Sequence, residues 1–278
     1  MKLSSGFLKR HSLVLGIMLM FLLTWPIDLA NLGVLPFQVP SILALFKGWG
    51  FVLAALIMTG LTLGKDAVFA LLKRFLIWRV GWTWYLAAFL LLPALFFIAI
   101  LLHASLSQKP IDYSTAMAYE IFGASASVPI IIVPYFIFEA ISNGEEIGWR
   151  GYFLPRLQVK YSALVSSLIT GVFWGFWHLP GYLVPSNDRS FMWFLIHTIA
   201  AAVLYTWTYN NTKGSLLLVT LLHASGNTAG VFLPIMFAMP GGILNNIVIM
   251  LEVIVAVLVT VIAGPAQLSR TEPKQVQV

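Results

Sequence analysis

Eight apolar stretches, each long enough to cross a lipid bilayer, follow one another along this chain. A membrane-spanning helix needs roughly 20 apolar residues, because the hydrocarbon core is about 30 Å thick. The stretches cover about residues 12–30, 48–64, 83–103, 120–142, 162–180, 190–209, 215–234 and 243–263. Since 60% of all residues are hydrophobic, well above the share in soluble domains, we predict an all-α, polytopic integral membrane protein with about eight transmembrane helices.

The basic residues predict how these segments are oriented, because cytoplasmic loops carry an excess of Lys and Arg. With a cytoplasmic N-terminus, only Lys47, Lys109 and Arg189 fall outside. The other 13 of the 16 basic residues fall inside: Lys2, Lys9, Arg10, Lys65, Lys73, Arg74, Arg79, Arg150, Arg156, Lys160, Lys213, Arg270 and Lys274. We therefore expect a multi-pass protein of the cell membrane with both termini in the cytoplasm.

Nothing along the chain marks a second domain. We expect a single transmembrane helical domain over residues 1–264, with residues 36–47 at the membrane interface or re-entering it, and a flexible cytoplasmic tail at 265–278. The net charge of +6 comes from basic loops, and no basic run is long enough to bind nucleic acid, so the expected surroundings are the lipid bilayer. Because the chain has no cysteine, disulfides, thiolate metal sites and a cysteine nucleophile are excluded.

A polar stretch directly follows the fourth apolar segment, at its expected cytoplasmic end. It reads Asn143-Gly144-Glu145-Glu146-Ile147-Gly148-Trp149-Arg150, in a chain with only 9% charged residues. In a helix, Glu146 and Arg150 are four residues apart and can form an ion pair, while Glu145 points about 100° away. One carboxylate is then held by a cation and the other is free to accept a proton. An ion pair closing a helix at the lipid headgroups explains the stretch equally well.

Three polar residues lie at helical spacing in or near later segments. His178 ends the fifth segment with Trp174 on the same helical face, although a lone histidine near a helix end is usually structural. His223 and Asn227 are four residues apart in the seventh segment and project from one face, where contact with lipid would be costly. A polar contact between helices is the simpler explanation of that pair.

Two other residues are less easily placed. Glu252 lies inside the eighth segment, where a carboxylate is expensive, and we expect it to lie near the polar cluster or to pair with Asn245 or another helix. His197 has no polar partner at helical spacing and is expected to be structural.

Together these motifs resemble the CPBP intramembrane protease family, which includes the type II CAAX prenyl endopeptidases and the bacteriocin-processing or immunity proteins also called Abi. The family pattern is E-E-x-x-x-R, then F-x-x-x-H, then H-x-x-x-N. The first motif matches at Glu145, Glu146 and Arg150, and the third at His223 and Asn227. The second matches at His178, with Trp174 in place of Phe. The resemblance covers about residues 120–235, the expected protease-like core.

The resemblance implies a role for each of these residues. Glu145 would be the general base for a water molecule, and His178 would help to hold and activate that water. Glu146 and Arg150 would orient the site as an ion pair. His223 and Asn227 would donate hydrogen bonds to the oxyanion that forms at the peptide carbonyl.

A second chemistry uses the same residues, because Glu145, His178 and His223 could instead bind Zn²⁺, which lowers the pKa of a bound water. We favour the site without a metal or other cofactor, since Asn227 beside His223 suits a paired donor. Other intramembrane proteases fit less well. H-E-x-x-H is absent, the aspartates lie at segment ends or in loops, and Ser225 near His223 is the only Ser–His candidate.

The expected function is that of an intramembrane endopeptidase that hydrolyses a peptide bond near the cytoplasmic membrane face. Prenylated C-terminal peptides, bacteriocin-type peptides and other membrane proteins are all compatible substrates. Two alternatives use the same sequence features. A catalytically silent bacteriocin-immunity or scaffolding protein would keep the fold without turnover. A proton-coupled transporter would use intramembrane ionisable residues, but the inverted repeats typical of transporters are not evident.

Overall fold

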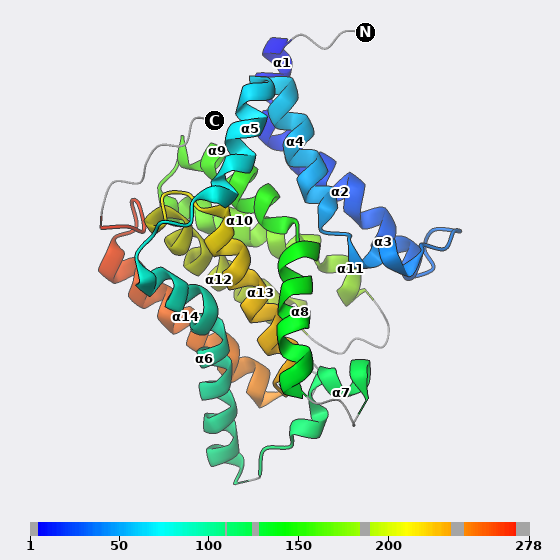
Figure 1. The fold of residues 1–278 in the computed structure, drawn as a ribbon, viewed down its shortest axis with the longest axis vertical. Helices are drawn as coiled ribbons and strands as arrows, with labels where there is room; N and C mark the ends of the chain where they lie inside the picture. Colours follow the sequence, from blue (N-terminus) through cyan, green and yellow to red (C-terminus); the bar gives the residue numbers. More distant parts are fainter. Residues whose placement is uncertain (1–4, 109, 124–127, 184–189, 235–241, 271–278) are drawn as a thin grey trace.

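The computed structural model describes residues 5–108, 110–123, 128–183, 190–234 and 242–270. Over these residues the protein is helical and contains no strand (Figure 1). The longer helices are α2 (Ser12–Asn31), α4 (Trp49–Leu63), α6 (Trp82–Ser107), α8 (Val128–Ser142), α10 (Ala163–Trp177), α12 (Phe191–Asn211), α13 (Leu216–Phe232) and α14 (Ile243–Ala263). Short helices connect them: α1 (Ser5–Arg10), α3 (Ser41–Leu45), α5 (Lys65–Lys73), η1 (Arg74–Leu76), η2 (Tyr113–Thr115), α7 (Met117–Phe122), η3 (Ile147–Phe153), α9 (Leu154–Gln158) and α11 (Leu179–Tyr182).

The eight longer helices correspond to the eight predicted segments. Four of them, α2, α6, α12 and α14, are long and apolar enough to cross a membrane, and α4, α8, α10 and α13 are shorter apolar helices. The prediction of an all-α, polytopic membrane protein is therefore confirmed.

Helix α12 lies at the centre of the bundle, packed between α10 and α14. Helix α13 packs against α6 and α8, while α2 and α4 form a pair that contacts η3. A side chain at Gly171 of α10 would place its Cβ only 2.5 Å from the Cα of Ile199 in α12. Small residues allow such close approach between membrane helices, so Gly171 helps to fix the α10–α12 interface.

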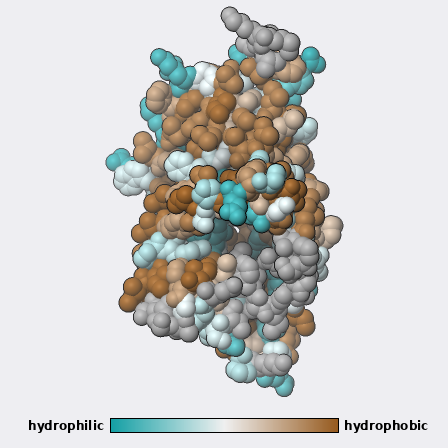
Figure 2. Space-filling view, turned by 90° about the vertical axis from the view of Figure 1, so that its right-hand side faces the viewer, coloured by the Kyte–Doolittle hydropathy of each residue, from teal (hydrophilic) through white to brown (hydrophobic). Residues whose placement is uncertain are grey.

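Large apolar side chains remain exposed on the outside of the bundle. Leu106 and Val261, on different helices, are both 75% exposed. Figure 2 shows a largely hydrophobic face that is hollowed at mid-height beside a few hydrophilic residues. An apolar surface this extensive is unusual for a protein in water and is expected of one surrounded by lipid.

The first motif follows the end of α8, as predicted, but the chain does not leave the protein there and the motif is buried. Gly144 lies against the start of α4, where its Cβ would come 2.7 Å from the carbonyl oxygen of Gly48. From there η3 continues with all its residues buried, and its Gly151 carbonyl accepts a hydrogen bond from Arg74. The connection between α8 and α10 is therefore not an exposed end at the lipid headgroups, and within it only residues 159–161 form an exposed turn.

The start of the predicted tail also differs from expectation. The carbonyl oxygens of Pro265 and Ala266 accept hydrogen bonds from the first residues of α10. Asn211, at the end of α12, donates to the carbonyl oxygen of Leu268, whose side chain is fully buried. The chain is thus held at least to Ser269, which hydrogen bonds Asn211, and the remainder of the predicted tail, 271–278, lies outside the described residues.

Candidate active site

The first motif is carried by a π-helix, η3, rather than by a regular α-helix. The Asn143 side chain accepts a hydrogen bond of 3.0 Å from the backbone N–H of Glu145, which begins a new helical turn after α8. A Cβ at Gly148 would lie 2.5 Å from the Phe51 ring of α4, so glycine is needed for this contact. π-Helical turns are frequent at functional sites, and here the turn directs polar side chains into the bundle.

The Glu146 carboxylate joins the first motif to the third. Its Oε1 accepts a hydrogen bond of 3.0 Å from Nη1 of Arg150 and one of 2.8 Å from Nδ1 of His223. Glu146 and Arg150 are fully buried, and His223 is 5% exposed. The ion pair predicted from the spacing of Glu146 and Arg150 is confirmed. Its link to His223, 77 residues further along the chain, was not predicted.

Aromatic rings enclose the Arg150 guanidinium. Its central carbon lies 4.8 Å from the ring centre of Trp174 and 4.4 Å from that of Tyr205. A cation over an aromatic face is attracted by the ring, most strongly where water is excluded. These contacts compensate for part of the cost of burying the charge and fix the plane of the guanidinium.

Glu145 is bonded to the second motif. Its Oε2 accepts a hydrogen bond of 2.9 Å from Nε1 of Trp174, and only 8% of the residue is exposed. Glu145 lies outside the apolar helices, between α8 and η3. Burial raises the pKa of this carboxyl above its ordinary value, whereas the charge of His223 and the Trp174 hydrogen bond act in the opposite direction. A raised pKa lies closer to neutral pH, where a carboxylate is then a more effective general base.

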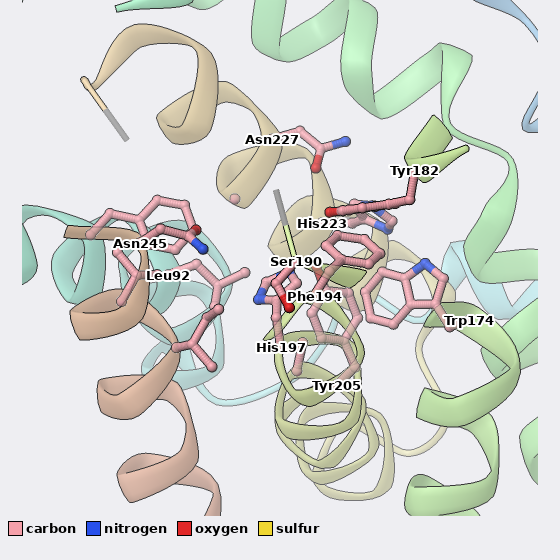
Figure 3. Close-up of a pocket in the computed structure, with 15 residues that line it drawn as sticks. Leu92, Trp174, Tyr182, Ser190, Phe194, His197, Tyr205, His223, Asn227 and Asn245 are labelled. Atoms are coloured by element: carbon pink, nitrogen blue, oxygen red, sulfur yellow. The ribbon is translucent and has the colours of Figure 1, made fainter. Parts of the chain in front are cut away.

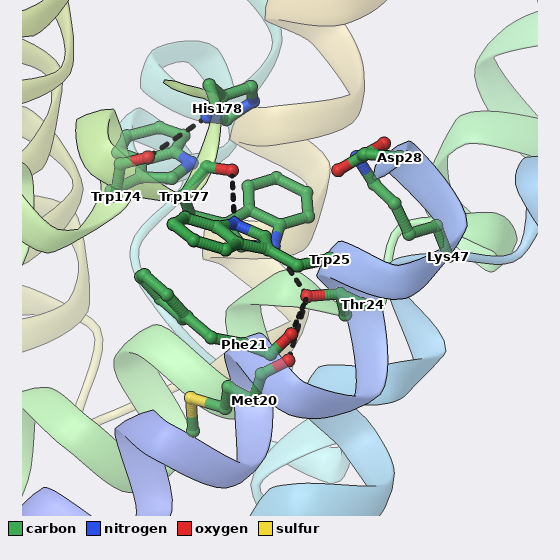
Figure 4. Close-up of polar contacts among 9 residues, drawn as sticks. All are labelled: Met20, Phe21, Thr24, Trp25, Asp28, Lys47, Trp174, Trp177 and His178. Carbon is green, nitrogen blue, oxygen red and sulfur yellow. Dashed lines mark hydrogen bonds and ion pairs between the residues drawn. The ribbon is translucent and has the colours of Figure 1, made fainter. Parts of the chain in front are cut away.

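His178 stands at the end of α10 and is held by its own backbone turn. Its Nδ1 lies 3.0 Å from the carbonyl oxygen of Trp174. Because a carbonyl only accepts, Nδ1 carries the proton, and in the neutral ring Nε2 keeps a free lone pair. Trp177 ties this end of α10 to α2, since its Nε1 donates to Thr24 and its carbonyl accepts from Trp25 (Figure 4).

Asn227 lies one turn beyond His223 on the same face of α13. One N–H of its amide donates a hydrogen bond of 2.9 Å to Oε2 of Glu139 in α8. The amide has a second N–H that is not used in this bond. Glu139 is a residue whose role the sequence did not reveal.

A cavity of about 110 Å³ lies in front of His223 and Asn227 (Figure 3). Trp174 and Tyr205 line it on the same side, and apolar residues such as Leu92 complete much of the wall. Glu145 and His178 are not among its lining residues. Both contact Trp174 instead, so the structure brings all three motifs together around this residue, while the cavity wall carries Trp174 of the second motif and both residues of the third.

One residue of the cavity wall belongs to a hydrogen-bonded pair that the sequence did not reveal. His197 of α12 lines the cavity, and its Nδ1 lies 2.5 Å from Oε2 of Glu252 in α14. Glu252 is fully buried. The expectation that Glu252 pairs with another helix is met by His197, whereas Asn245 lines the same cavity. Since the two partners lie 55 residues apart, no local spacing could have identified them.

The residues expected to bind zinc are not gathered into a metal site in the described part of the chain. Across the part of the chain that the structure describes, no three His, Asp or Glu side chains gather closely enough to hold a metal ion. Glu145, His178 and His223, the ligands expected for zinc, each contact Trp174. Trp174 donates to the first, accepts from the second and packs 5.5 Å from the third.

A bundle of apolar helices with buried, hydrogen-bonded Glu, Arg and His residues defines an intramembrane protein built around a polar site. Residues 125–229 match the family model for type II CAAX prenyl endopeptidase Rce1-like. CAAX prenyl protease 2 from Methanococcus maripaludis is 28% identical in an alignment of 145 residues that covers 49% of this chain. The match covers 51% of that relative, about half its length. Over residues 125–229 the chain is thus similar to the type II CAAX prenyl endopeptidases, in agreement with the resemblance that its motifs predicted.

Proposed function

We propose that this protein is an intramembrane endopeptidase that hydrolyses a peptide bond with a water molecule activated by Glu145. The observation that carries this proposal is a set of three hydrogen bonds that join the three motifs. Glu146 binds Arg150 and His223, and Glu145 binds Trp174. Ionisable groups inside a membrane protein are costly to bury, so those that are found there are usually functional. A connected network of carboxylates, an arginine and a histidine suits acid–base chemistry.

The first step is attack by water on the peptide carbonyl. Glu145 uses Oε2 to accept from Trp174, so Oε1 is free to take a proton from water. The lone pair on Nε2 of His178 accepts the second hydrogen of that water and orients it. The water oxygen bonds to the carbonyl carbon, and the proton moves to Glu145. When the C–N bond breaks, Glu145 returns this proton to the leaving nitrogen.

The negative charge that develops on the carbonyl oxygen is stabilised from α13. Glu146 accepts the Nδ1 hydrogen of His223, so in the imidazolium form Nε2–H is a donor into the cavity. The unused N–H of Asn227 is the second donor. Two carboxylates, Glu145 and Glu146, are then balanced by two cations, Arg150 and His223, which limits the cost of burying the cluster. No metal or other cofactor takes part in this scheme.

The substrate we propose is a prenylated peptide with a C-terminal CAAX sequence. Support comes from the name of the relative, CAAX prenyl protease 2, and from the apolar cavity. At about 110 Å³ the cavity is smaller than one of about 150 Å³ that holds benzene. It suits an aliphatic side chain of the peptide, while the prenyl chain would lie in the bilayer. Cleavage of a farnesylated peptide by the purified protein tests the proposal directly.

We further propose that both termini face the cytoplasm, with the site inside the membrane. The Tyr152 hydroxyl donates to the carbonyl of Ser12 at the start of α2. Glu145 precedes Tyr152 by seven residues, and η3 between them is buried, so the site lies within the bundle below the proposed cytoplasmic end of α2. In the cysteine-free chain, Lys160→Cys is expected to resist an impermeant thiol reagent on intact cells, and Val34→Cys to react. Labelling of position 160 and not of 34 would reverse the orientation.

Replacing Trp174 with phenylalanine tests whether Glu145 is the base. The change introduces the residue of the family pattern and removes the hydrogen bond that lowers the pKa of Glu145. A protonated carboxyl cannot accept a proton, so the rate rises with pH as Glu145 ionises. Trp174→Phe should therefore move the acid limb of the kcat/KM profile to higher pH, with cleavage retained.

Trp177→Phe is the matched control, because Trp177 donates to Thr24 instead of Glu145. Its acid limb is expected to coincide with that of the unmodified protein. If Trp174→Phe leaves the acid limb unmoved in a folded, active enzyme, Glu145 is not the titrating base.

A further inference from the structure

A second cavity, with a volume of about 330 Å³, opens beside α5, η3 and α9. Its charged groups are Arg74, Arg156 and the exposed Asp66. Leu71 and Gly151 form part of the remaining wall. None of these residues takes part in the proposed peptide hydrolysis.

Both arginines are fixed in place by neutral groups. Nη1 of Arg74 donates 2.8 Å to the Tyr209 hydroxyl and 3.2 Å to the Gly151 carbonyl. Nη1 of Arg156 donates 2.9 Å to the Tyr152 carbonyl, and its guanidinium lies 3.7 Å from the centre of the Tyr152 ring. Each guanidinium therefore has further N–H groups that these contacts leave available.

These two charges lack an ion-pair partner among the described residues. Among the described residues, neither arginine forms an ion pair with a carboxylate, Asp66 included. Burial lowers the pKa of Arg156, and the positive charge of Arg74 contributes in the same direction. Two partly buried cations that share one cavity favour the binding of an external anion.

We propose that this cavity binds a phosphate group, supplied by the headgroup of an anionic membrane lipid. Arginine presents a planar set of donors that matches phosphate oxygens, and basic pockets between membrane helices are known sites for lipid headgroups. Helix α5 carries lysines at both ends and exposes Phe69 and Leu72. This amphipathic pattern suits a helix lying at the membrane interface, where headgroup phosphates are found.

Native mass spectrometry of the detergent-purified protein with phosphatidylglycerol or phosphatidylcholine of equal chain length tests the proposal. We expect phosphatidylglycerol to remain bound under conditions that strip phosphatidylcholine. Arg74→Gln and Arg156→Gln should each weaken retention about tenfold, the effect of losing charge-assisted hydrogen bonds. Arg79→Gln is the matched control, because Arg79 is exposed, stacks on Trp78 and does not line the cavity.

Equal retention of the two lipids by the unmodified protein would overturn the proposal, and this arm does not depend on whether the variants fold. Equal weakening by Arg79→Gln would also overturn it, since the effect would then be one of overall charge. Inorganic phosphate separates the two sources of the ligand. If millimolar phosphate raises the melting temperature as much as phosphatidylglycerol does, the lipid assignment is wrong, whereas stabilisation by the lipid alone supports it.

Discussion

Glu145→Gln is expected to lower the rate of cleavage of a farnesylated CAAX peptide by about 10²–10⁴-fold, the usual contribution of a general base. Glutamine keeps the shape of the side chain and an oxygen for the Trp174 hydrogen bond, so the fold should be retained. It cannot accept a proton from water. The effect is therefore expected in kcat, with KM little changed, as measured by mass spectrometry of the released peptide.

Two controls accompany this variant. Asp112→Asn also removes a carboxylate, but in an exposed turn between α6 and α7, and should cleave at the unmodified rate. Exhaustive chelation separates water activation by Glu145 from a zinc mechanism. The proposed chemistry predicts an unchanged rate, whereas loss of activity on chelation and its return with zinc would show that a metal generates the nucleophile.

Glu146→Gln is expected to destabilise the protein more than any other single change considered. The substitution leaves the fully buried Arg150 without its partner anion and removes the carboxylate that holds His223. Breaking a buried ion pair costs about 3–5 kcal/mol. In a chain of this size that corresponds to a fall in melting temperature of roughly 10 °C, measurable in detergent by thermal unfolding.

Asp28→Asn provides the comparison for Glu146→Gln. Asp28 forms an ion pair of 2.9 Å with Lys47, but both side chains are more than a fifth exposed. A pair reached by water contributes only about 0–1 kcal/mol, so this change should be nearly neutral for stability. If the two variants melt at the same temperature, the Glu146 network is not a major source of stability.

The helical segments could be predicted from the sequence because hydrophobic length is a local property. The chain after α8 could not. Its charges suggested an exposed end, whereas Gly144 and Gly148 let it pack against α4 and the Glu146–Arg150 pair makes its burial tolerable. Whether the chain can approach α4 this closely depends on the residues of α4. The sequence of residues 143–150 alone therefore does not predict the contact.

The candidate site was predicted in part. Spacing along one helix identified the Glu146–Arg150 pair and the shared face of His223 and Asn227. Contacts between helices could not be predicted from the sequence. Glu252 and His197, for example, are brought together only by the packing of α14 on α12. For the same reason the sequence could place His178 near Trp174 but could not show that both Glu145 and His178 bond to that residue.

Isotope incorporation tests the central claim most directly. The purified protein, reconstituted in liposomes, is given a farnesylated CAAX peptide in water enriched in ¹⁸O, beside Glu145→Gln under the same conditions. We predict that the prenylated product carries one ¹⁸O atom in its new carboxylate and that Glu145→Gln forms this product at least about 10²-fold more slowly. An intact peptide with the folded, unmodified protein, or equal rates for the two proteins, would contradict hydrolysis by a Glu145-activated water.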